Sequence, residues 1–211
     1  MPGGFANKTL GVVLAGGVGR RMGGVDKSRI RIGDATILSR LRERFEPQCA
    51  KLLLSANGDT ARFADTDLVV VADDEADNAG PLAGILAALD WSARHAPEID
   101  WIVSVPADCP FLPRDLVARL HQARVDGGMP LACAASAQRL HPVIGLWPVA
   151  LRDDLRQALR GEGLRKVELW AARHGIARAA WPIAPFDPFF NVNTPDDVAK
   201  ANRIAALFPE A

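Results

Sequence analysis

The chain has 211 residues, and its 25 basic and 25 acidic side chains cancel to zero net charge. An apolar fraction of 49% and a charged fraction of 24% are ordinary for a globular protein and exclude a disordered, collagen-like or coiled-coil chain. The zero net charge argues against a nucleic-acid partner, because duplex-binding proteins usually carry a basic excess.

The first half of the chain alternates short apolar runs with stretches in which apolar residues recur at helical spacing. In chain order, this pattern predicts a strand over 10–15, a helix from 36 to 46, strands over 51–55 and 68–71, a helix through 82–89, a strand over 101–105 and a helix from 113. Pro47 is expected to end the first helix, and Pro113 to lie in the first turn of the last one. Strands that alternate with helices predict a mostly parallel sheet covered on both faces.

The pattern changes after residue 128. The apolar runs 131–135 and 143–147 flank a polar turn, which predicts an antiparallel element at the edge of the sheet. Two helices near 149–160 and 165–173, a strand near 178–184 and a helix beginning at Thr194 are predicted to follow. No linker rich in Pro, Gly or Ser divides the sequence, so we expect one domain over 1–211, an α/β fold built as a three-layer α/β/α sandwich.

The most informative stretch follows the first strand, between Leu14 and Lys27. It holds five glycines, which let a backbone approach a ligand closely, and exposed amides in such a loop form an anion-binding concavity. Five basic residues and one acid lie between Arg20 and Arg31, which creates a positive field in a neutral chain. The stretch therefore predicts a phosphate-binding loop suited to a triphosphate; the alternative is a flexible glycine loop with a solvated basic rim.

Two familiar phosphate-binding patterns do not match this loop. A P-loop is excluded, because Asp26 precedes Lys27 where that motif needs glycine. The dinucleotide pattern, started from Gly17 and Gly19, would need glycine at Met22, which disfavours a nicotinamide-dependent dehydrogenase.

A carboxylate follows the fourth predicted strand, where Asp108 lies between Pro106 and Pro110. Ligands of open α/β sheets collect outside the carboxyl ends of the strands, so the glycine loop and Asp108 are expected on neighbouring strands at one rim. A carboxylate beside a triphosphate is unfavourable unless a cation lies between them, and Mg²⁺ bound by one or two carboxylates and phosphate oxygens resolves this. Asp108 is thus the predicted metal ligand; the alternative is a turn-forming aspartate.

Further polar candidates follow the other strands. Asn57 comes after the second strand, and Asp73 and Asp74 come after the third, so a base or ribose contact and a turn or cap are both open for these side chains. The helix that opens at 80–84 offers free backbone N–H groups, or is simply a helix start.

The last candidates lie in the second half of the chain. Asn191 and Asn193 are two residues apart and share a face if the chain is extended there; the alternative is that Asn193 merely precedes a helix cap. His141 begins a strand, where either a structural or a functional role is open. The remaining histidines fall on predicted helical stretches and are expected at the surface: His95, His121 and His174.

Together these segments resemble the molybdenum cofactor guanylyltransferases, a family of Rossmann-like nucleotidyltransferases. The matching segments keep the family's order between residues 14 and 195: LAGG at 14–17, RRMGG at 20–24, DK at 26–27, GPLAG at 80–84, PADCPF at 106–111, HP at 141–142 and NVNTP at 191–195. Many nucleotidyltransferases share the glycine loop alone, whereas the RMGG, GPLAG and NVNTP segments together are much more specific.

The resemblance implies transfer of GMP from GTP to the phosphate of molybdopterin, with the molybdenum-loaded form as the expected acceptor. The products would be the guanine dinucleotide cofactor and pyrophosphate, and the cofactor would be Mg²⁺. Beyond GTP and molybdopterin, the implied partners are cofactor-delivery and molybdoenzyme-chaperone proteins, with no nucleic acid and no membrane.

Residue by residue, the resemblance implies nucleotide contacts at Leu14, Ala15, Gly16, Gly17, Lys27, Asn57, Asp73, Gly80, Pro81, Leu82 and Asp108. The choice of Asp73 over Asp74 rests on its distance from Gly80. Asp108 is implied as the shared ligand of GTP and Mg²⁺. His141, Asn191 and Asn193 fall where the family binds the acceptor or completes the metal site, and both roles stay open.

The expected mechanism needs no strong general base, because an acceptor phosphate is already a nucleophile. Catalysis then consists of alignment and charge neutralisation. Mg²⁺ on Asp108 would polarise the α-phosphate, while Arg20 and Lys27 would stabilise the departing pyrophosphate. These three residues are the predicted catalytic residues.

The alternatives are a related nucleotidyltransferase that uses CTP or a sugar-phosphate acceptor, and a non-catalytic nucleotide-binding module. The three cysteines are odd in number and far apart, so neither a disulfide framework nor a zinc site is expected and a reducing cytoplasm fits best. No run approaches the roughly 18 apolar residues of a membrane span.

Overall fold

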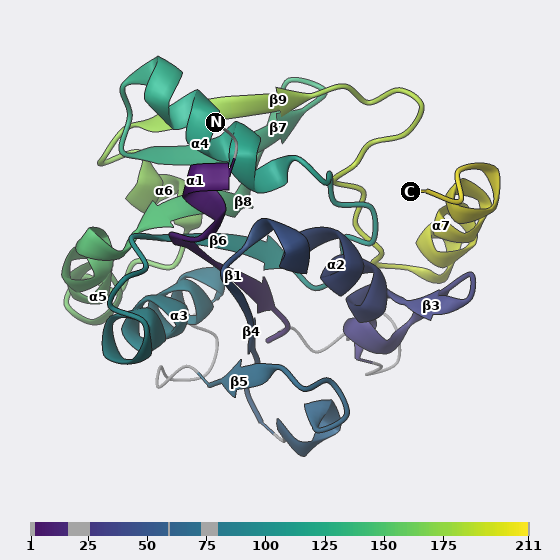
Figure 1. Cartoon of the computed structure of the whole chain (residues 1–211), viewed down its shortest axis with the longest axis horizontal. Helices are drawn as coiled ribbons and strands as arrows, with labels where there is room; N and C mark the ends of the chain where they lie inside the picture. The colour runs from purple at the N-terminus through teal and green to yellow at the C-terminus, as the bar shows by residue number, and fades with distance from the viewer. Residues whose placement is uncertain (1–2, 17–25, 59, 73–79, 211) are drawn as a thin grey trace.

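The computed structural model describes residues 3–16, 26–58, 60–72 and 80–210. Seven strands form one sheet that runs from β9 at the top of Figure 1 to β5 at the bottom. Across the sheet, the strands are β5 (Val69–Val71), β4 (Lys51–Ser55), β1 (Thr9–Leu14), β6 (Trp101–Pro106), β8 (Arg139–Pro148), β7 (Leu131–Ser136) and β9 (Ile176–Trp181).

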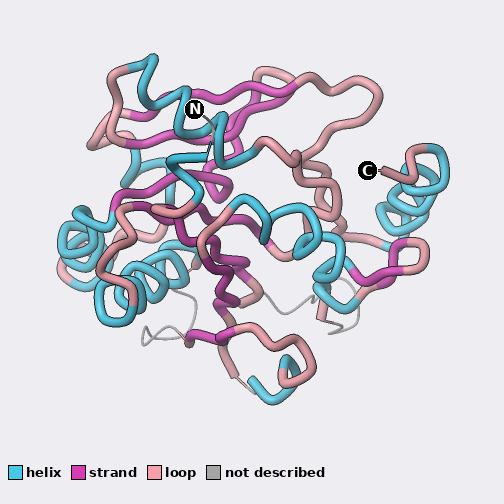
Figure 2. Tube along the Cα trace, in the orientation of Figure 1, coloured by secondary structure: helices cyan, strands magenta, loops and turns pink. Residues whose placement is uncertain are grey.

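The described helices lie between many, but not all, of these strands along the chain (Figure 2). The α-helices are α1 (Gly3–Ala6), α2 (Ile37–Phe45), α3 (Pro81–His95), α4 (Leu116–Gly127), α5 (Arg152–Arg160), α6 (Val167–Ala171) and α7 (Pro195–Leu207). Short 3-10 turns are η2 (Lys27–Arg29), η3 (Glu46–Gln48), η4 (Thr60–Phe63) and η5 (Val149–Leu151), and a two-stranded ribbon joins β2 (Arg31–Ile32) to β3 (Ala35–Thr36). No helix within these ranges is long and apolar enough to cross a bilayer.

The sheet is mostly parallel, as the sequence predicts. Strands β5, β4, β1 and β6 are parallel neighbours, and β9 is parallel to β7. The predicted place of the antiparallel element is wrong, however, because β8 lies inside the sheet between β6 and β7. A tight turn with positive φ at Ala137 and Gln138 joins β7 to β8, and β9 then pairs outside β7 and becomes the edge strand.

Two apolar layers cover the two faces of the sheet. Successive residues of a strand point to opposite faces, so Val13 belongs to the apolar layer that includes residues of α2 and α4, while Val12 belongs to the layer that includes residues of α3, α5 and α6. Both residues are completely buried, which explains why the first strand is a continuous apolar run rather than an alternating one. The three-layer α/β/α arrangement predicted from the sequence is confirmed.

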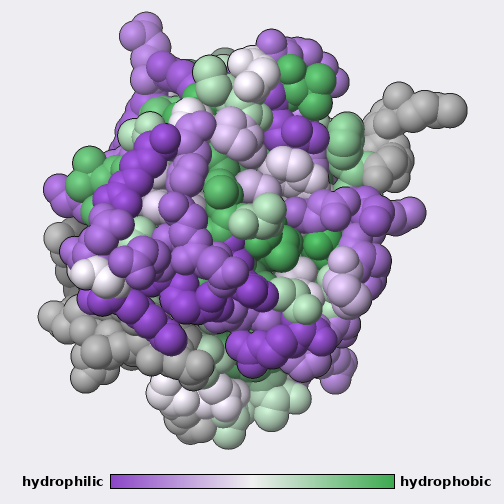
Figure 3. All heavy atoms as spheres, turned by 90° about the vertical axis from the view of Figure 1, so that its left-hand side faces the viewer, coloured by the Kyte–Doolittle hydropathy of each residue, from purple (hydrophilic) through white to green (hydrophobic). Residues whose placement is uncertain are grey.

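The outer surface of α3 and α5 is polar. The left-hand side of Figure 1, where these helices lie, is covered largely by hydrophilic side chains with smaller hydrophobic areas between them (Figure 3). Part of this polar surface is an ion-pair network in which Arg156 contacts both Asp90 of α3 and Asp153 of α5. The apolar residues of both helices therefore face the sheet.

Several element boundaries differ from the sequence expectation. Helix α4 begins at Leu116, three residues after Pro113, whose carbonyl accepts a hydrogen bond from the Leu116 amide (3.3 Å). Strand β9 ends at Trp181, because Pro182 has no N–H group for the ladder. The predicted start of α7 is confirmed: Thr194 is its N-cap, and a capping box links Thr194 to Asp197.

His121 is not at the surface as expected but fully buried. Its Nε2 atom lies 2.8 Å from Thr9 Oγ1, and its ring stacks on Phe5 of α1 at a centroid distance of 4.3 Å. Burial, with a smaller contribution from Arg124, lowers the pKa of His121 to about 4. The short helix α1 covers this part of α4, which the helical pattern alone does not reveal. His95 is exposed as expected.

Candidate active site

The carboxyl ends of three parallel strands meet at one rim of the sheet. Leu14, the last residue of β1, is paired with Ser55 of β4 on one side and with Pro106 of β6 on the other. The Ala15 amide donates to the Ser55 carbonyl (2.7 Å), and the Ala107 amide donates to the Leu14 carbonyl (3.1 Å). The segments that carry Gly16, Asn57 and Asp108 therefore start side by side, as the strand pattern predicts.

Four of the predicted site residues form one hydrogen-bonded group at this rim, which we call the Asp108 cluster: Lys27, Asp108, Asn191 and Asn193. The Lys27 ammonium lies 3.1 Å from Asp108 Oδ2 and also donates to Asn193 Oδ1. On the other side of the carboxylate, Asn191 Nδ2 donates to Asp108 Oδ1 at 3.0 Å. The Lys27 and Asp108 side chains are 23% and 16% exposed, so both are held yet open to a ligand.

Lys27 is positioned by the residue before it. Asp26 caps the 3-10 turn η2, and its Oδ1 accepts hydrogen bonds from the Ser28 amide (3.0 Å) and hydroxyl (2.6 Å). Its other oxygen, Oδ2, forms an ion pair with Arg62 Nε at 3.2 Å that lacks hydrogen-bond geometry. Neither Asp26 nor Arg62 is among the residues predicted for the site; an aspartate two residues before a serine is a turn signal that could have identified the first of them.

Asn191 and Asn193 are held in place by two anchors. The Val192 amide donates to the Asp108 carbonyl (2.9 Å), which docks the segment onto the loop after β6. The Asp197 carboxylate of α7 accepts from the Asn193 amide at 3.0 Å and from the Thr194 amide at 2.9 Å. Burial alone would raise the pKa of Asp197, but these hydrogen bonds and the one from the Thr194 hydroxyl lower it overall. Asp197 therefore stays ionised and holds the start of the helix.

His141 does not hydrogen-bond to the Asp108 cluster. Its Nε2 atom lies 2.8 Å from Ser136 Oγ, and its ring is 4.9 Å from that of Phe189. Phe189 in turn packs edge-on against Trp181 at 5.2 Å, so we call His141, Trp181 and Phe189 the aromatic corner. Burial lowers the pKa of His141, although Asp187 opposes the effect. Since Phe189 is two residues before Asn191, the aromatic corner adjoins the Asp108 cluster.

The predicted nucleotide contacts at the start of α3 are placed by two glycines. Gly80 has a φ of 73°, which other residues adopt only with strain, and the chain enters α3 at Pro81. A side chain at Gly84 would lie 2.7 Å from Ser55 Oγ and 2.8 Å from Leu14, so glycine lets the first turn of α3 approach the strand ends. Leu82 is completely buried, which leaves its backbone rather than its side chain for a ligand.

The remaining predicted site residues are only partly described. Leu14 is half-buried and Ala15 is buried at the end of β1, while Gly16 and Asn57 are exposed at the rim. Gly17, Arg20 and Asp73 lie outside the described residues. Neither the catalytic role expected of Arg20 nor the choice between Asp73 and Asp74 is therefore addressed by the structure.

The oxygen atoms of the Asp108 cluster fit a hard divalent cation. Asp108 Oδ2 and Asn193 Oδ1 both face the Lys27 ammonium, which stands where a cation between the two oxygens would lie. Carboxylate and amide oxygens are the protein ligands that Mg²⁺ accepts, usually one or two of them with water and phosphate oxygens. Within the described ranges, no three or more His, Cys, Asp or Glu side chains gather as a metal site, so a cation at the Asp108 cluster would have one carboxylate and an amide oxygen as protein ligands.

Comparison with known proteins identifies the family of the chain. The MobA-like NTP transferase domain matches residues 11–174. The molybdenum cofactor guanylyltransferase of Nitrobacter hamburgensis is 55% identical over 199 residues, covering 94% of this chain and 95% of the relative. The enzyme of the same name from Rhodopseudomonas palustris is 56% identical over 199 residues, covering 94% and 93%.

Solved structures share the fold. The molybdopterin-guanine dinucleotide biosynthesis protein A of Archaeoglobus fulgidus superposes with a TM-score of 0.73 at 24% identity, covering 94% of this chain and 99% of that chain. A CMP:2-keto-3-deoxy-manno-octonic acid synthetase complexed with CTP superposes with a TM-score of 0.72 at 13% identity, covering 95% and 99%. From the domain match and the extent of identity, the chain belongs to the MobA-like NTP transferase family and is a nucleotidyltransferase.

Proposed function

We propose that this nucleotidyltransferase transfers GMP from GTP to the phosphate of molybdopterin or its molybdenum-loaded form, with Mg²⁺ as cofactor and pyrophosphate as second product. One observation carries the proposal: residues from segments up to 166 positions apart meet in the Asp108 cluster at the carboxyl ends of the parallel strands. The relatives that share more than half of their residues with this chain are named for guanylyl transfer in molybdenum cofactor synthesis, which supports the choice of substrates.

The nucleotide is proposed to lie across the ends of β1, β4 and β6. Among the described residues, no atom lies within 4 Å of the position that a side chain at Gly16 would take, and we propose that a triphosphate approaches the backbone there. Asn57 at the end of β4 and the backbone at the start of α3 flank this position. The N-terminal end of a 15-residue helix adds free N–H groups and a partial positive charge toward an anion.

Lys27 is proposed to exchange partners during the reaction. In the structure, its ammonium neutralises the Asp108 carboxylate and donates to the Asn193 side-chain oxygen. When nucleotide binds, the flexible lysine side chain turns to the phosphates, where a positive charge stabilises the departing pyrophosphate. A single electrostatic contact of this kind contributes ~3 kcal/mol to transition-state stabilisation in other enzymes.

Asp108 and Asn193 are the residues that would hold Mg²⁺. The ion, when bound, supplies positive charge to the α-phosphate and so favours attack by the acceptor phosphate. Asn191 keeps Asp108 Oδ1 engaged, which leaves Oδ2 as the carboxylate oxygen that faces the cation position. The acceptor phosphate is itself the nucleophile, so the proposed step requires alignment rather than a proton-abstracting base.

The acceptor is proposed to bind on the side of the aromatic corner. His141 offers a half-buried ring nitrogen, and the burial that lowers its pKa keeps it neutral near pH 7. A neutral imidazole and the Asn191 amide can both hydrogen-bond the polar edge of a flat heterocycle such as a pterin. Asn191 thus borders both the metal position and the acceptor.

We further propose that residues 1–211 act as one nucleotidyltransferase domain in the cytoplasm. The sheet draws its strands from Thr9 to Trp181, and α7 contributes Ala201 and Ile204 to the same apolar layer as α2 and α4. The three cysteines are free thiols, in keeping with a reducing compartment. Cofactor-delivery and molybdoenzyme-chaperone proteins are the proposed protein partners; coprecipitation from a molybdoenzyme-producing cell would test them.

Nucleotide choice is the first test of the proposal. Calorimetric titrations with GTP, CTP, ATP and UTP, each with and without Mg²⁺, should show selective binding of GTP that is tighter with the metal. Selective CTP binding would replace the guanylyl donor by a cytidylyl donor at the same site. The absence of binding by every nucleotide, for a protein shown to be folded, would overturn the proposed reaction altogether.

A further inference from the structure

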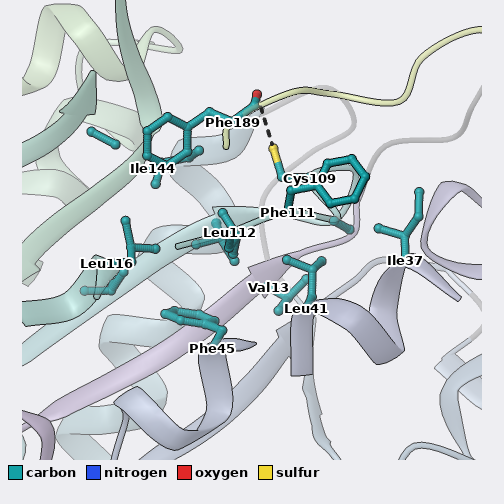
Figure 4. Packing of buried hydrophobic residues seen from close by; sticks show 14 of the residues in the cluster. Val13, Ile37, Leu41, Phe45, Cys109, Phe111, Leu112, Leu116, Ile144 and Phe189 are labelled. Atoms are coloured by element: carbon teal, nitrogen blue, oxygen red, sulfur yellow. Dashed lines mark hydrogen bonds between the residues drawn. The ribbon is translucent and has the colours of Figure 1, made fainter. Parts of the chain in front are cut away.

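A completely buried thiol lies directly behind the Asp108 cluster. Cys109 follows Asp108, and its Sγ atom is 3.4 Å from Asn191 Oδ1 and 3.9 Å from the Phe189 carbonyl oxygen. Figure 4 shows the sulfur directed at the Phe189 carbonyl. The proposed reaction gives this residue no role, so its contacts need a separate explanation.

The amide of Asn191 has two ends with opposite requirements. Its Nδ2 donates to Asp108 Oδ1 at 3.0 Å, and its Oδ1 faces the thiol of Cys109. If the amide were rotated by half a turn, its oxygen would face the carboxylate, and two acceptors would confront each other. The contact with Cys109 at the oxygen end therefore favours the same orientation as the contact with Asp108 at the nitrogen end.

We propose that Cys109 is a positioning residue, which orients the Asn191 amide and through it fixes the Asp108 carboxylate for the metal and the nucleotide. The consequence of this inference for catalysis rests on the proposed function. The orientation of the Asn191 amide does not, because it can be measured without any substrate. Cys109 touches neither substrate, so it acts through Asn191 alone.

The thiol is suited to donate rather than to react. Cys109 is completely buried within an apolar layer, and such surroundings favour the uncharged thiol over the charged thiolate. A protonated thiol is a weak donor, and the two carbonyl oxygens in reach are acceptors. Enclosure in the core also keeps oxidants and metals away from the sulfur.

The contact with Asn191 explains why Asp108 directs its Oδ2 atom, and not its Oδ1 atom, toward Lys27 and the proposed cation position. With Oδ1 engaged by Asn191, the carboxylate plane is set and Oδ2 faces Lys27. The amide of Val192 binds the Asp108 carbonyl, so backbone and side chain of Asp108 are both tied to the same segment. Removing the thiol would leave the Asn191 oxygen without this donor and let the amide rotate when a ligand competes for Asp108.

A matched set of variants separates this role from simple core packing. Cys109→Ala removes the donor, and Cys109→Ser restores a donor at the same position. Cys133→Ala is the control, because Cys133 is equally buried but its Sγ atom lies 3.7 Å from the Pro142 carbonyl oxygen and not near Asn191. Both alanine variants lose one sulfur atom from the core, so their losses of thermal stability should be similar.

The first readout needs no substrate: the side-chain amide resonances of Asn191 in ¹H–¹⁵N spectra of the full-length chain. We expect Cys109→Ala to shift or broaden these signals, Cys109→Ser to keep them sharp, and Cys133→Ala to leave them unchanged. Infrared difference spectra between wild type and Cys109→Ala should also show the S–H stretching band of a hydrogen-bonded thiol. Unchanged Asn191 signals in Cys109→Ala would overturn the proposal.

The second readout is catalytic. For Cys109→Ala, we expect kcat to fall by roughly three- to tenfold and the Mg²⁺ concentration for half-maximal rate to rise, while the KM for GTP stays near wild type. Cys109→Ser should recover most of the loss. Equal changes in Cys109→Ala and Cys133→Ala would show a packing effect and contradict the proposal. If the wild type itself failed to transfer GMP, the proposed function would fall, while the Asn191 signals would still decide the role of Cys109.

Discussion

The Asp108 cluster and the aromatic corner lie side by side, but they are built on different physical principles. The cluster consists of charged and amide groups that satisfy one another, with Lys27 between two oxygens and Asn191 on the far side of the carboxylate. The corner consists of aromatic rings in tilted and edge-on contact, with Phe189 almost completely buried between His141 and Trp181. From this difference, we expect one half of the rim to bind charged groups and the other half to offer a mostly apolar surface of defined shape.

This division predicts that substitutions in the two regions affect different steps. In the Asp108 cluster, each group is the partner of another, so loss of one leaves the others without compensation. In the aromatic corner, a substitution changes the shape of the surface and leaves the charge balance intact. Nucleotide and metal binding should therefore depend on the cluster, and acceptor binding on the corner.

The largest effect is expected from Asp108→Ala. Loss of the carboxylate removes the proposed metal ligand, and kcat should fall by at least about 100-fold, as for loss of a key electrostatic group in other enzymes. Because Asp108 is partly exposed, the melting temperature should remain within a few degrees of wild type. The assay is pyrophosphate release with GTP, Mg²⁺ and molybdopterin, with circular dichroism as the control for folding. A variant that stays active and magnesium-dependent would contradict the assignment.

Lys27→Ala should have the next largest effect. It should weaken the binding of GTP but strengthen the binding of a divalent cation in the absence of nucleotide. Loss of the ammonium should weaken GTP binding by roughly 10- to 100-fold and acceptor binding much less. In the absence of nucleotide, however, it frees Asp108 Oδ2 and Asn193 Oδ1, so Mn²⁺ should bind more tightly than to the wild type. Calorimetry and Mn²⁺ electron paramagnetic resonance measure the two quantities.

Lys27→Arg is the matched control, because it keeps a cation between the two oxygens. It should leave ligand-free Mn²⁺ binding weak. Equal weakening of GTP and acceptor binding by Lys27→Ala, or weaker Mn²⁺ binding in that variant, would show that Lys27 does not occupy the cation position.

His141→Ala tests the aromatic corner, and its effect on the reaction should be smaller than the effects of Asp108→Ala and Lys27→Ala. It removes a neutral side chain that contacts Ser136 and Phe189, so the KM for molybdopterin should rise by roughly three- to tenfold. The dissociation constant of GTP, measured by calorimetry, should stay within about twofold of wild type. His141→Gln retains hydrogen-bonding capacity and should recover part of the loss. A larger effect on GTP than on the acceptor would break the proposed division of the rim.

The smallest effect concerns acid stability and His121, which is buried under α1 and is not one of the predicted site residues. His121 is buried and neutral with a pKa of about 4, whereas in the unfolded chain it takes up a proton below about pH 6.5. Between these pH values the unfolded state binds more protons, so the free energy of unfolding should fall as the pH is lowered from 6.5 toward 4.

Melting temperatures at pH 7.5 and pH 5 measure this acid effect. In His121→Gln, which cannot take up the proton, the loss on acidification should be smaller than in the wild type. Part of the loss should remain, because burial also lowers the pKa of His141 and the same sign applies to it. An acid loss as large in His121→Gln as in the wild type would assign the effect to other groups.

Much of the site could be predicted from the sequence because its residues follow strand ends. Strand periodicity locates the ends of β1, β4 and β6, and parallel strands place their carboxyl ends at one rim. These two rules are enough to bring Gly16, Asn57 and Asp108 together. The contact of Lys27 with Asn193 was not predicted, because 166 residues separate them and no local pattern links the two; the family resemblance implied a separate role for each residue.

The features that were missed depend on contacts between distant segments. The interior place of β8 follows from β9 pairing outside β7, and neither strand's own sequence determines its neighbour. His121 is buried because α1 covers it. The apolar pattern of α4 alone does not show whether His121 faces the core or the solvent. The ion pair of Asp26 with Arg62 likewise joins segments whose proximity only the folded chain reveals.

The central claim is that the Asp108 cluster transfers a guanylyl group to molybdopterin. It is tested most directly by incubating the purified chain with molybdopterin, Mg²⁺ and an equimolar mixture of GTP and CTP, and by identifying the dinucleotide product by mass spectrometry. The account predicts the guanine dinucleotide from the wild type and none from Asp108→Ala. A cytosine dinucleotide, no dinucleotide from the folded wild type, or equal guanine product from Asp108→Ala would contradict it.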